Sequence, residues 1–369
     1  MAQYDKSSDL EKMSEDAMLE YIQETPAVLQ GLLDHRKEYT KEFVDNFVEN
    51  RYEKMILIGS GTSYHGSLST RAFIERTLGI SVDANYPLLY MNFTSVFDKK
   101  TIVIGTSQGG ESKSTIHGLE YSKKHGCYTV SLTEQGKESK LAQYSDLALK
   151  LNCGEKELAG PKTKGYQATM LNLILLALET GLALHTIEQN YYDDVIARIQ
   201  KTIDNLQNVI DESIAWYQRN REEFKIGKRI IVVGYDNNYG NVLEGRLKIE
   251  EAVRYGIEGY ELEEFFHGIY HSIDEGVHII YLAQEGSSKE RAIKLRDFMR
   301  DYTPHEFMIG NFDCEHSQDL SIHFVDDKEF CIFEYIIPLQ IFAFYCSKDL
   351  GINANIPKII NFHYLMGSK

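Results

Sequence analysis

Short apolar runs that each lead into a turn of small residues recur along this chain. Met55–Ile58 and Thr101–Gly105 are each followed by a small polar turn and then by a helix-like segment, and Tyr128–Leu132 is a third such run. Strand, turn, helix and strand in this order predict a parallel sheet with helices on both faces.

The same plan begins again in the second half of the chain. Arg229–Gly234 ends in glycine and leads into the helix-like Asn241–Arg254, and His278–Ala283 is another strand-like run. The distance from the first turn to the second is nearly equal in the two halves. This spacing predicts an internal duplication of one α/β unit.

Two helix-rich stretches lie outside the strand-rich segments. Residues 8–50 carry apolar side chains three and four positions apart, and Pro26 is expected to break the run. Tyr166–Phe224 is also helix-rich, and its second part has the pattern of a connecting helix. These patterns predict a helical N-terminal segment at 1–50, a first α/β domain at 51–190, a connecting helix at 191–226, and a second α/β domain with a tail at 227–369.

Charge and composition narrow the possible partners. The 369 residues include 39 basic and 55 acidic side chains, a net charge of −16, which disfavours nucleic acid and anionic membranes but not a small anion in a local pocket. The start of the chain lacks the order of a signal peptide, and the longest apolar run, near Met170–Leu184, is too short to span a bilayer. Five cysteines without a C-x-x-C pair favour reduced thiols. We therefore expect a cytoplasmic protein.

Two of the predicted strand-to-helix turns are rich in hydroxyls and glycine. They are Ser60–Ser63 and Thr106–Ser112. Small residues let backbone N–H groups approach an anion, and a helix N-terminus adds unpaired donors. Either turn alone is also explained by ordinary helix capping. Neither has the lysine of a nucleoside triphosphate loop nor a dinucleotide glycine fingerprint, so ATP and NAD are not indicated.

The predicted helix of the second half carries a charged face. Glu244, Lys248 and Glu251 are spaced to share one face, while Arg246 and Glu250 form a separate pair. Such spacing is common on a solvated helix face. Its position directly after the strand that opens the second unit also suits an acid–base site.

The turns S-G-T-S and S-Q-x-G-E-S resemble those of the sugar isomerase (SIS) domain family. The resemblance extends, over roughly residues 50–365, to the two-domain isomerase half of glucosamine-6-phosphate synthase. It implies two flavodoxin-like domains, each a three-layer α/β/α arrangement around a parallel sheet. It also implies that the two turns bind a phosphosugar. By position, the implicated substrate-binding residues are Thr62, Ser63, Ser107, Gln108, Gly109 and Ser112. The family often has serine at Gly109, so a backbone N–H must serve there. Lys162 lies in a segment similar to the family's loop before the long helix.

The segment L-E-G-x-L-K-x-x-E resembles the family's catalytic helix. The resemblance gives Glu251 the proton transfer between sugar C1 and C2, and gives Lys248 a supporting or sugar-binding role. It also implies that His267 opens the sugar ring or acts as the general acid, and that it does so across the interface of a homodimer. A higher oligomer stays open as an alternative. His267 and His271 are four apart, but no third ligand is obvious, so we expect neither metal nor cofactor.

The chain also departs from the synthase. Its first fifty residues cannot hold a glutaminase domain, and Phe362, beside His363, stands where the synthase has its Schiff-base lysine. A chain that keeps Glu251 and His267 resembles the deglycases of fructosamine- and glucoselysine-type 6-phosphates. We therefore expect an enzyme that splits a 6-phosphorylated sugar–amino acid adduct into hexose 6-phosphate and amino acid. An aldose–ketose isomerase, an aminosugar-phosphate deaminase and a non-catalytic phosphosugar-binding protein are the alternatives.

Overall fold

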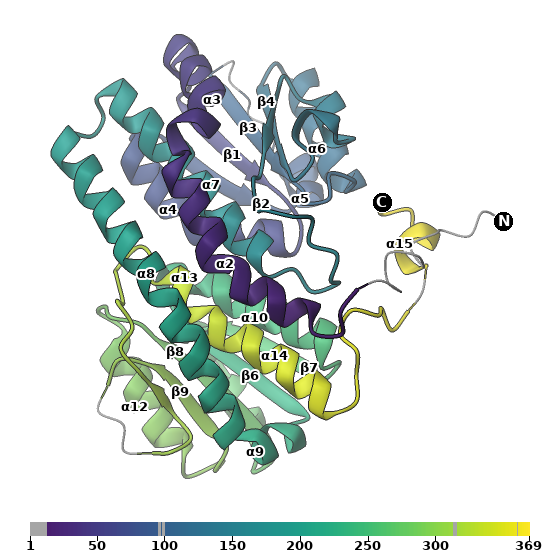
Figure 1. The fold of residues 1–369 in the computed structure, drawn as a ribbon, viewed down its shortest axis with the longest axis vertical. Coiled ribbons are helices and arrows are strands. Elements are labelled where there is room, and N and C mark those ends of the chain that lie inside the picture. Colours follow the sequence, from purple (N-terminus) through teal and green to yellow (C-terminus); the bar gives the residue numbers. More distant parts are fainter. Residues whose placement is uncertain (1–12, 95–96, 98–99, 313–315, 360) are drawn as a thin grey trace. The chain divides into compact units, whose positions relative to one another are not determined.

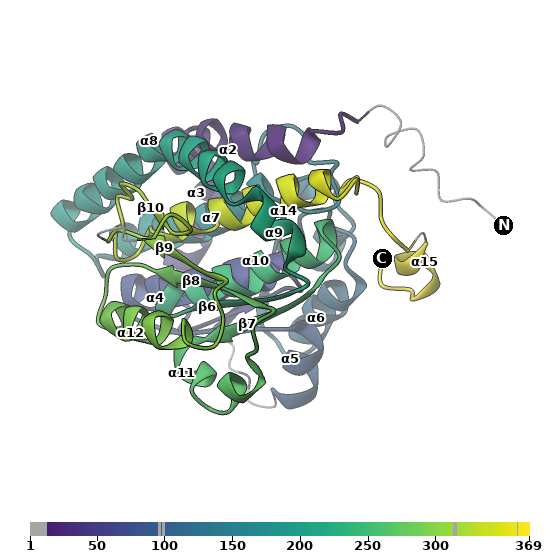
Figure 2. The same cartoon turned by 90° about the horizontal axis from the view of Figure 1, so that it is seen from below.

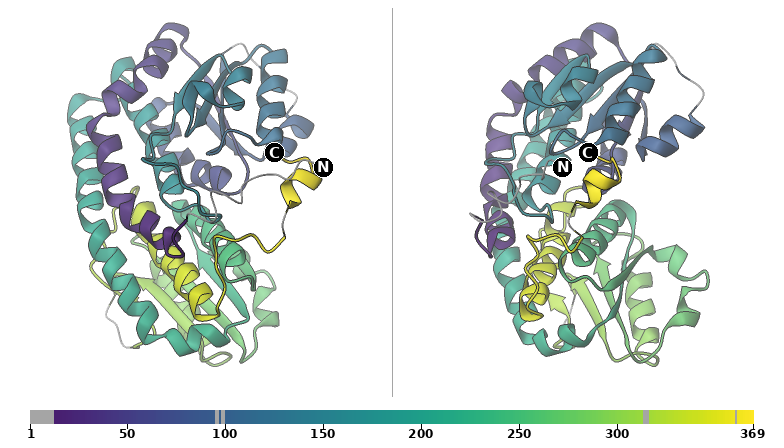
Figure 3. Two further views of the ribbon diagram at one scale, coloured as in Figure 1. Left: turned by 45° about the vertical axis from the view of Figure 1, so that its right-hand side comes forward. Right: turned by 90° about the vertical axis from the view of Figure 1, so that its right-hand side faces the viewer.

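The computed structural model describes residues 13–94, 97, 100–312, 316–359 and 361–369. Within them, the strands form two five-stranded sheets in which every pair of neighbours is parallel. The first sheet has the order β2-β1-β3-β4-β5 and the second the order β7-β6-β8-β9-β10. The second order repeats the first strand for strand, which confirms the predicted pair of α/β units. The right-hand view of Figure 3 shows helices on both faces of each sheet.

The strands of the two sheets correspond in pairs, each sheet having its longest apolar strands at its centre. Their bounds are β1 Lys54–Ile58, β2 Ser81–Asn85, β3 Thr101–Thr106, β4 Tyr128–Thr133, β5 Leu147–Lys150, β6 Arg229–Gly234, β7 Gly256–Glu261, β8 Val277–Ala283, β9 Glu306–Gly310 and β10 Leu320–Ser321.

The chain separates into two compact units, one around each sheet. The β1–β5 unit contains Ala27–Glu157, Lys164–Ala197 and the tail Lys358–Lys369. The β6–β10 unit contains Arg198–Pro357, Leu158–Thr163 and the start of the chain up to Pro26. These bounds differ from the predicted ones in two ways. The N-terminal segment and the connecting helix are each divided between the two units, and the tail belongs to the unit of the first sheet.

The core of the β1–β5 unit follows the alternation of its strands. Ile56 and Ile58 of β1 pack with Ile116 and Leu119 of helix α6 (Lys113–Lys124) on one face. Gly118 permits this approach, because a Cβ there would lie 2.6 Å from Ile58 Cδ1. Helix α5 (Pro87–Phe93) packs beside α6, and α4 (Thr62–Leu78), α3 (Arg36–Asn50) and α7 (Lys164–Leu184) pack together (Figure 1).

The apolar run near Met170–Leu184 lies inside helix α7 (Lys164–Leu184), in the stretch predicted to be rich in helix. Helix α7 has 21 residues, which by length and composition alone is enough to cross a membrane. Most of its apolar window is buried inside the protein. It is therefore placed as a core helix, against which α3 and α4 pack.

The predicted helical break at Pro26 is wrong. Helix α2 (Ala17–Asp34) continues through Pro26, and the chain instead bends at His35 before α3 begins. The Thr25 hydroxyl donates to the Tyr21 carbonyl at 3.1 Å, a side-chain bond inside the turn that contains the proline. The part of the predicted segment before residue 13 lies outside the described residues.

The β6–β10 unit repeats the layered packing with different helices. Ile231 and Val233 of β6 pack with Leu295 and Met299 of α12 (Lys289–Met299). Helix α11 (Leu262–Phe265) lies on the same side of the sheet as α12, as Figure 2 shows. Helices α10 (Tyr239–Ala252) and α14 (Ile337–Asp349) pack together. The long helix α8 (Gln189–Arg219) joins the units and α9 (Arg221–Ile226) follows it.

The cysteines agree with the reduced state expected for them. Cys127, Cys153, Cys331 and Cys346 are buried and unpaired. Burial raises the pKa of the Cys127 thiol to about 11, so this side chain stays protonated at neutral pH. Cys314 lies outside the described residues.

Candidate functional site

The two hydroxyl-rich turns lie side by side at a switch point of the first sheet. Strands β1 and β3 are neighbours, and Ile58 pairs with Gly105 at their carboxyl ends. From β1 the chain crosses to β2 on one side, and from β3 it crosses to β4 on the other. In open α/β sheets, ligands bind where neighbouring connections diverge in this way. The sequence predicted both turns, and the sheet order brings them together.

The first turn places the N-terminus of α4 at this edge. Gly61 precedes the helix with a φ of +55°, a conformation that side chains rarely adopt. A Cβ at Gly59 would lie 2.8 Å from Ser63 Cβ, so the strand must end in glycine for the helix to begin so close. Thr62 is partly exposed and Ser63 is nearly buried. The helix N-terminus thus offers backbone donors beside two hydroxyls.

The second turn is closed by its own backbone. The Gly110 N–H donates to the Ser107 carbonyl at 2.8 Å, and Gly110 has a φ of +66°. Gly109 at its tip is exposed, and a Cβ there would meet no atom within 4 Å. Ser112 begins α6 without a capping bond from its side chain, and its hydroxyl accepts from Thr115 Oγ1 at 3.1 Å. The backbone amides of the first turn of α6 therefore remain uncapped by Ser112.

Gln108 occupies a different place from the other turn residues. Its side-chain amide donates to Glu134 at 2.6 Å and to Glu157 at 2.9 Å, and the residue is only 8% exposed. Glu157 also accepts from the Gly165 N–H at 3.2 Å. Gln108 therefore ties the second turn to the beginning of α7. Its role as a substrate contact stays a prediction.

Sequence reasoning missed the buried polar group beneath this turn. Glu157 and Lys164 are almost fully buried, and the Cys153 thiol donates to Glu134 at 3.5 Å. Burial, reinforced by the charges of Glu134 and Glu157, raises the pKa of Cys153. The stretch that supplies Glu157 is polar and lacks helical or strand periodicity, so no local signal marked this carboxylate as buried.

The C-terminal tail reaches the second turn. The carbonyl of Ser368 accepts from the Lys113 N–H, the first amide of α6, at 3.2 Å. Phe362 begins the short helix α15 (Phe362–Leu365) and is 48% exposed, and His363 Nδ1 lies 2.8 Å from Ser368 Oγ. The tail is thus placed next to Ser112, a relationship that spacing alone could not reveal.

The corresponding switch point of the second sheet lacks these features. Tyr235, after β6, donates through its hydroxyl to the Gln284 carbonyl after β8, and the Gln284 amide donates back to the Tyr235 carbonyl at 2.8 Å. The neighbouring Asp326 is buried, and this burial raises its pKa to about 6. Cross-bonded side chains beside carboxyl groups leave a poor place for a phosphate. Within the described residues, the turns predicted to bind phosphate therefore lie at the switch point of the β1–β5 unit.

The charged face predicted in the second half lies on helix α10. Lys248 Nζ is 2.6 Å from Glu251 Oε2 and 3.4 Å from Glu244 Oε1, so the three share one face as predicted. Lys248 and Glu244 are buried, whereas the Glu251 side chain is 38% exposed. Burial, with the nearby Glu251 charge in addition and Arg246 opposing both, raises the pKa of Glu250. Glu251 is therefore an accessible carboxylate held by a buried lysine.

His267 follows α11 on the surface of the same unit. Its residue is exposed, and the short helix before it is capped by the Glu261 carboxylate, which accepts from the amides of Glu263 and Glu264. Among the described residues, no hydrogen bond or ion pair joins His267 to Glu251. Lys162 is partly exposed, in the segment Leu158–Thr163 of this unit.

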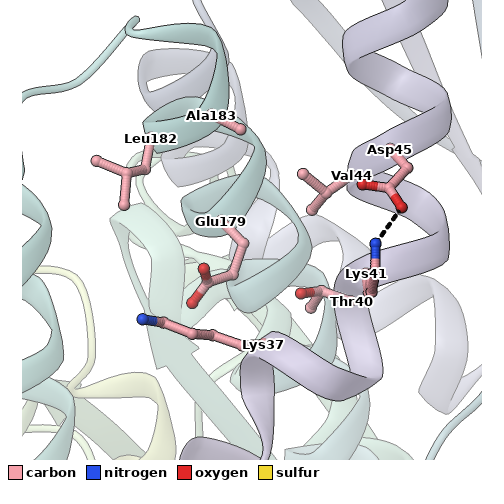
Figure 4. Close-up of a pocket in the computed structure, with 8 residues that line it drawn as sticks. All are labelled: Lys37, Thr40, Lys41, Val44, Asp45, Glu179, Leu182 and Ala183. Carbon is pink, nitrogen blue, oxygen red and sulfur yellow. Dashed lines mark hydrogen bonds and ion pairs between the residues drawn. The ribbon is translucent and has the colours of Figure 1, made fainter.

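A surface hollow lies elsewhere on the β1–β5 unit. It is formed between α3 and α7, and its lining includes the Lys41–Asp45 ion pair and Glu179 (Figure 4). Glu179 is also engaged by the Tyr192 hydroxyl at 2.5 Å and by Arg36 at 3.2 Å. None of the predicted site residues lines this hollow, so it takes no part in the site.

The two sheets define a protein built from two α/β units of like topology, and comparison with known proteins identifies its family. Residues 50–179 match the SIS domain family. The crystal structure of a candidate phosphosugar isomerase from Clostridium difficile 630 is 32% identical, covers 95% of this chain and 98% of its own, and superposes with a TM-score of 0.90. A candidate sugar-binding protein from Salmonella typhimurium LT2 is 31% identical over 88% of this chain and 98% of its own, with a TM-score of 0.80. The chain belongs to the SIS domain family.

More distant relatives share the same region. The glutamine–fructose-6-phosphate aminotransferase of Caldanaerobacter subterraneus is 25% identical over 93% of this chain but only 58% of its own length. The human aminotransferase 2 is 25% identical over 90% of this chain and 47% of its own. The chain thus spans about half the length of the curated relatives it matches.

Proposed function

We propose that this protein is a phosphosugar–amine deglycase. Its substrate would be a 6-phosphorylated sugar joined to an amino acid, of the fructoselysine, fructosyl-asparagine or glucoselysine type. Its products would be a hexose 6-phosphate and the free amino acid. The observation that carries the proposal is the Glu251 carboxylate, which belongs to a side chain 38% exposed and lies 2.6 Å from a buried lysine on α10.

In this proposal, the paired turns hold the phosphate. Thr62, Ser63, Ser107 and Ser112 supply hydroxyls, and the N-termini of α4 and α6 supply backbone donors, as does the open amide of Gly109. The support comes from their position at the β1–β3 switch point. A chain with a net charge of −16 offers no general attraction to phosphate, so local dipoles and hydroxyls must provide it.

Glu251 would carry the proton in the reaction. For an open-chain 1-amino ketose, it removes a proton from C1, and an enaminol forms between C1 and C2. The same proton returns to C2, which leaves an imine at C1. Water then adds to this imine and releases the amine, with an aldose 6-phosphate as the other product. A 2-amino aldose would undergo the reverse shuttle and release fructose 6-phosphate.

Lys248 and His267 have supporting roles in this proposal. The buried ammonium of Lys248 would hold the Glu251 carboxylate in place. His267 would open the sugar ring and act as the acid, since imidazole exchanges protons near neutral pH. Its exposed loop suits a residue that acts in a second copy of the chain, and we propose a homodimer that uses it in this way.

The tail favours a substrate that already contains its amine. Phe362 cannot form a Schiff base with a sugar carbonyl, and a substrate already joined to an amine needs no amine from the enzyme. The 32% identity to a candidate phosphosugar isomerase supports a second function, aldose–ketose isomerisation, which uses the same C1–C2 proton transfer without an amine. An aminosugar-phosphate deaminase would differ in releasing ammonia.

The test is product analysis with defined substrates. Purified protein is given 6-phosphofructosyl-lysine, its asparagine counterpart and 6-phosphoglucosyl-lysine, and separately fructose 6-phosphate and glucosamine 6-phosphate. We expect hexose 6-phosphate and free amino acid in equal amounts from one of the adducts. Interconversion of fructose and glucose 6-phosphates alone would establish the isomerase, and ammonia from glucosamine 6-phosphate the deaminase.

Variants of adjacent glutamates make the test specific. E251Q removes the proposed proton carrier and should lower kcat by at least about a thousandfold, as loss of a proton-shuttling group does. E250Q changes the neighbouring carboxylate, which lies near Arg246 on another face of α10, and should keep the rate. If E251Q retains full rate on a substrate that the protein turns over, the assigned mechanism is wrong.

A further inference from the structure

Two histidines and a glutamate meet at the amino ends of strands β8 and β9. His278 is the second residue of β8, His305 directly precedes β9, and Glu223 lies in α9. The Ile279 N–H donates to the His305 carbonyl at 2.9 Å, so strand pairing sets the two histidines beside each other. Their rings stack with centroids 4.2 Å apart and planes 9° apart. The three residues come from separate parts of the chain but from one compact unit.

The ligand-type atoms of this group converge on a small volume. One side-chain nitrogen from each histidine and one Glu223 oxygen all lie within 4.8 Å of one another. His278 Nε2 is 3.8 Å from Glu223 Oε1, and His305 Nδ1 is in direct contact with the same oxygen. Ligands of a tetrahedral zinc ion lie about 3.3 Å apart, given bonds of about 2.0–2.1 Å. The separation of 3.8 Å between His278 Nε2 and Glu223 Oε1 is already close to that spacing.

Hydrogen bonding within the protein leaves His278 incompletely satisfied. Its side chain is 3% exposed, and its Nδ1 has no hydrogen-bond partner among the described residues. Its Nε2 lies 3.1 Å from the Glu223 carbonyl. If the proton is on Nε2, the buried Nδ1 has a lone pair with no donor. If the proton is on Nδ1, the lone pair of Nε2 faces two other acceptors, the Glu223 carbonyl and Glu223 Oε1. A cation between the side chains removes the second conflict.

The protonation state of the pair suits metal binding. Burial, and after it the charge of His305, lowers the pKa of His278, while the backbone and charge of Glu223 oppose this shift. His278 is therefore neutral near neutral pH, and neutral imidazole is the form that ligates a metal.

The surroundings hold the ligands and leave one side open. A Cβ at Gly227 would lie 2.8 Å from the His278 ring, so the chain after α9 can approach only as glycine. The His305 and Glu223 side chains are 17% and 29% exposed, which gives an ion a route from solvent. Two histidines and one glutamate are a ligand set that zinc uses, with water in the fourth position.

We propose that Glu223, His278 and His305 bind one divalent transition-metal ion of the zinc type. The ion would tie α9 to the starts of β8 and β9, and it would stabilise the β6–β10 unit. This site has no part in the proposed sugar chemistry, so each proposal can fail alone. The pattern His267–His271 that the sequence suggested is a separate pair of exposed histidines.

The experiment measures metal binding directly. Full-length protein, freed of purification tags and stripped with a chelator, is titrated with Zn²⁺ by calorimetry and with Co²⁺ by visible spectroscopy. We expect one ion per chain and the intense absorption of tetrahedral Co²⁺. Zn²⁺ should also raise the melting temperature of the wild-type protein, because an ion that binds only the folded chain stabilises it.

Variants of the two accessible ligands test the assignment without replacing the buried His278. E223Q and H305Q should each weaken binding by at least about tenfold and abolish the Zn²⁺-dependent rise in melting temperature. H271Q is the control and should bind as the wild type does. Circular dichroism checks the fold of each metal-free variant. If H305Q does not fold, the metal affinity of E223Q alone tests the assignment. Uptake far below one ion per chain, or unchanged affinity in E223Q, would overturn the proposal.

Discussion

The Gln108 side-chain amide donates a 2.9 Å hydrogen bond to the buried Glu157 carboxylate, and the same carboxylate oxygen accepts the backbone N–H of Gly165. One acidic side chain thus connects the proposed phosphate turn to the first turn of α7. Because charge-assisted hydrogen bonds are strong when buried, the conformation of the turn depends on this carboxylate. It also depends on the absence of a side chain at position 165.

Gly165→Ala should displace Gln108 and destabilise the protein. Alanine normally stabilises a helix relative to glycine by about 0.5–1 kcal/mol. Here the added Cβ would overlap the Gln108 amide group, which must then leave Glu134 and Glu157. We expect a net loss of about 1–3 kcal/mol, measured by urea unfolding, and weaker binding of glucose 6-phosphate.

A matched glycine on another helix provides the control. A Cβ at Gly31 in α2 would meet no atom within 4 Å. Gly31→Ala should therefore raise the free energy of unfolding by up to about 1 kcal/mol. If the two variants change stability in the same direction, Gln108 does not hold the turn as described.

Ser112→Ala should weaken phosphosugar binding more than it changes turnover. The serine stands at the start of α6 and makes no capping bond, and its hydroxyl contacts the Ser114 and Thr115 hydroxyls, which we expect a phosphate to replace. Loss of a hydrogen bond to a charged group costs about 1.5–3 kcal/mol, which is roughly a tenfold or larger rise in Kd. Calorimetry with glucose 6-phosphate measures this change, and kcat should vary little because the phosphate is remote from the reacting carbons.

Ser288 is the matched control for Ser112. It precedes α12 in the repeated unit, also makes no capping bond, and follows the strand that corresponds to β3. Ser288→Ala should leave the Kd unchanged. Equal effects of the two substitutions would indicate a general loss of helix stability and would contradict a phosphate site at Ser112.

Most inner strands were predictable because they are continuous apolar runs, but the buried inner strand β9 (Glu306–Gly310) was not predicted. β1, β3, β4, β6 and β8 follow the predicted runs within one or two residues. The strands β2 (Ser81–Asn85) and β7 (Gly256–Glu261) were not predicted, since each is an edge strand with several polar or partly exposed residues. An edge strand that is covered on one face carries too weak a pattern for sequence alone.

The candidate site was predictable only where its residues are local in sequence. Each turn directly follows an apolar strand, and the Glu244–Lys248–Glu251 face depends on helical spacing. The bond between Gln108 and Glu157 joins residues 49 positions apart, and His305 meets Glu223 across 82 positions. Such contacts are set by strand order and packing, and no periodicity in the sequence encodes them.

The stability of the β6–β10 unit should fall as pH rises because of Glu306. This residue begins β9 with its side chain 1% exposed, and its carboxyl group accepts from the Tyr281 hydroxyl at 2.7 Å. Burial, opposed by the Tyr281 bond and by Arg300 and Arg296, raises its pKa to about 8. In the unfolded chain a glutamate has a pKa of about 4.3. Between these values the folded protein keeps a proton that the unfolded chain releases, so stability decreases with rising pH by up to about 1.4 kcal/mol per unit.

Glu306→Gln isolates this effect, since glutamine is neutral at every pH and nearly the same size. We expect the unfolding midpoint of the wild type in urea to decrease relative to E306Q as the pH is raised from about 5 to about 8. E290Q, which removes an exposed carboxylate on α12, should follow the wild type throughout. Parallel curves for the wild type and E306Q would mean that Glu306 is ionised in the folded protein, where Arg300 lies 3.7 Å away. In that case the buried carboxylate is paired with Arg300 across the whole range. E306Q should then be the less stable protein at every pH, because it leaves Arg300 with Asp297 and Asp319 as its acidic partners among the described residues.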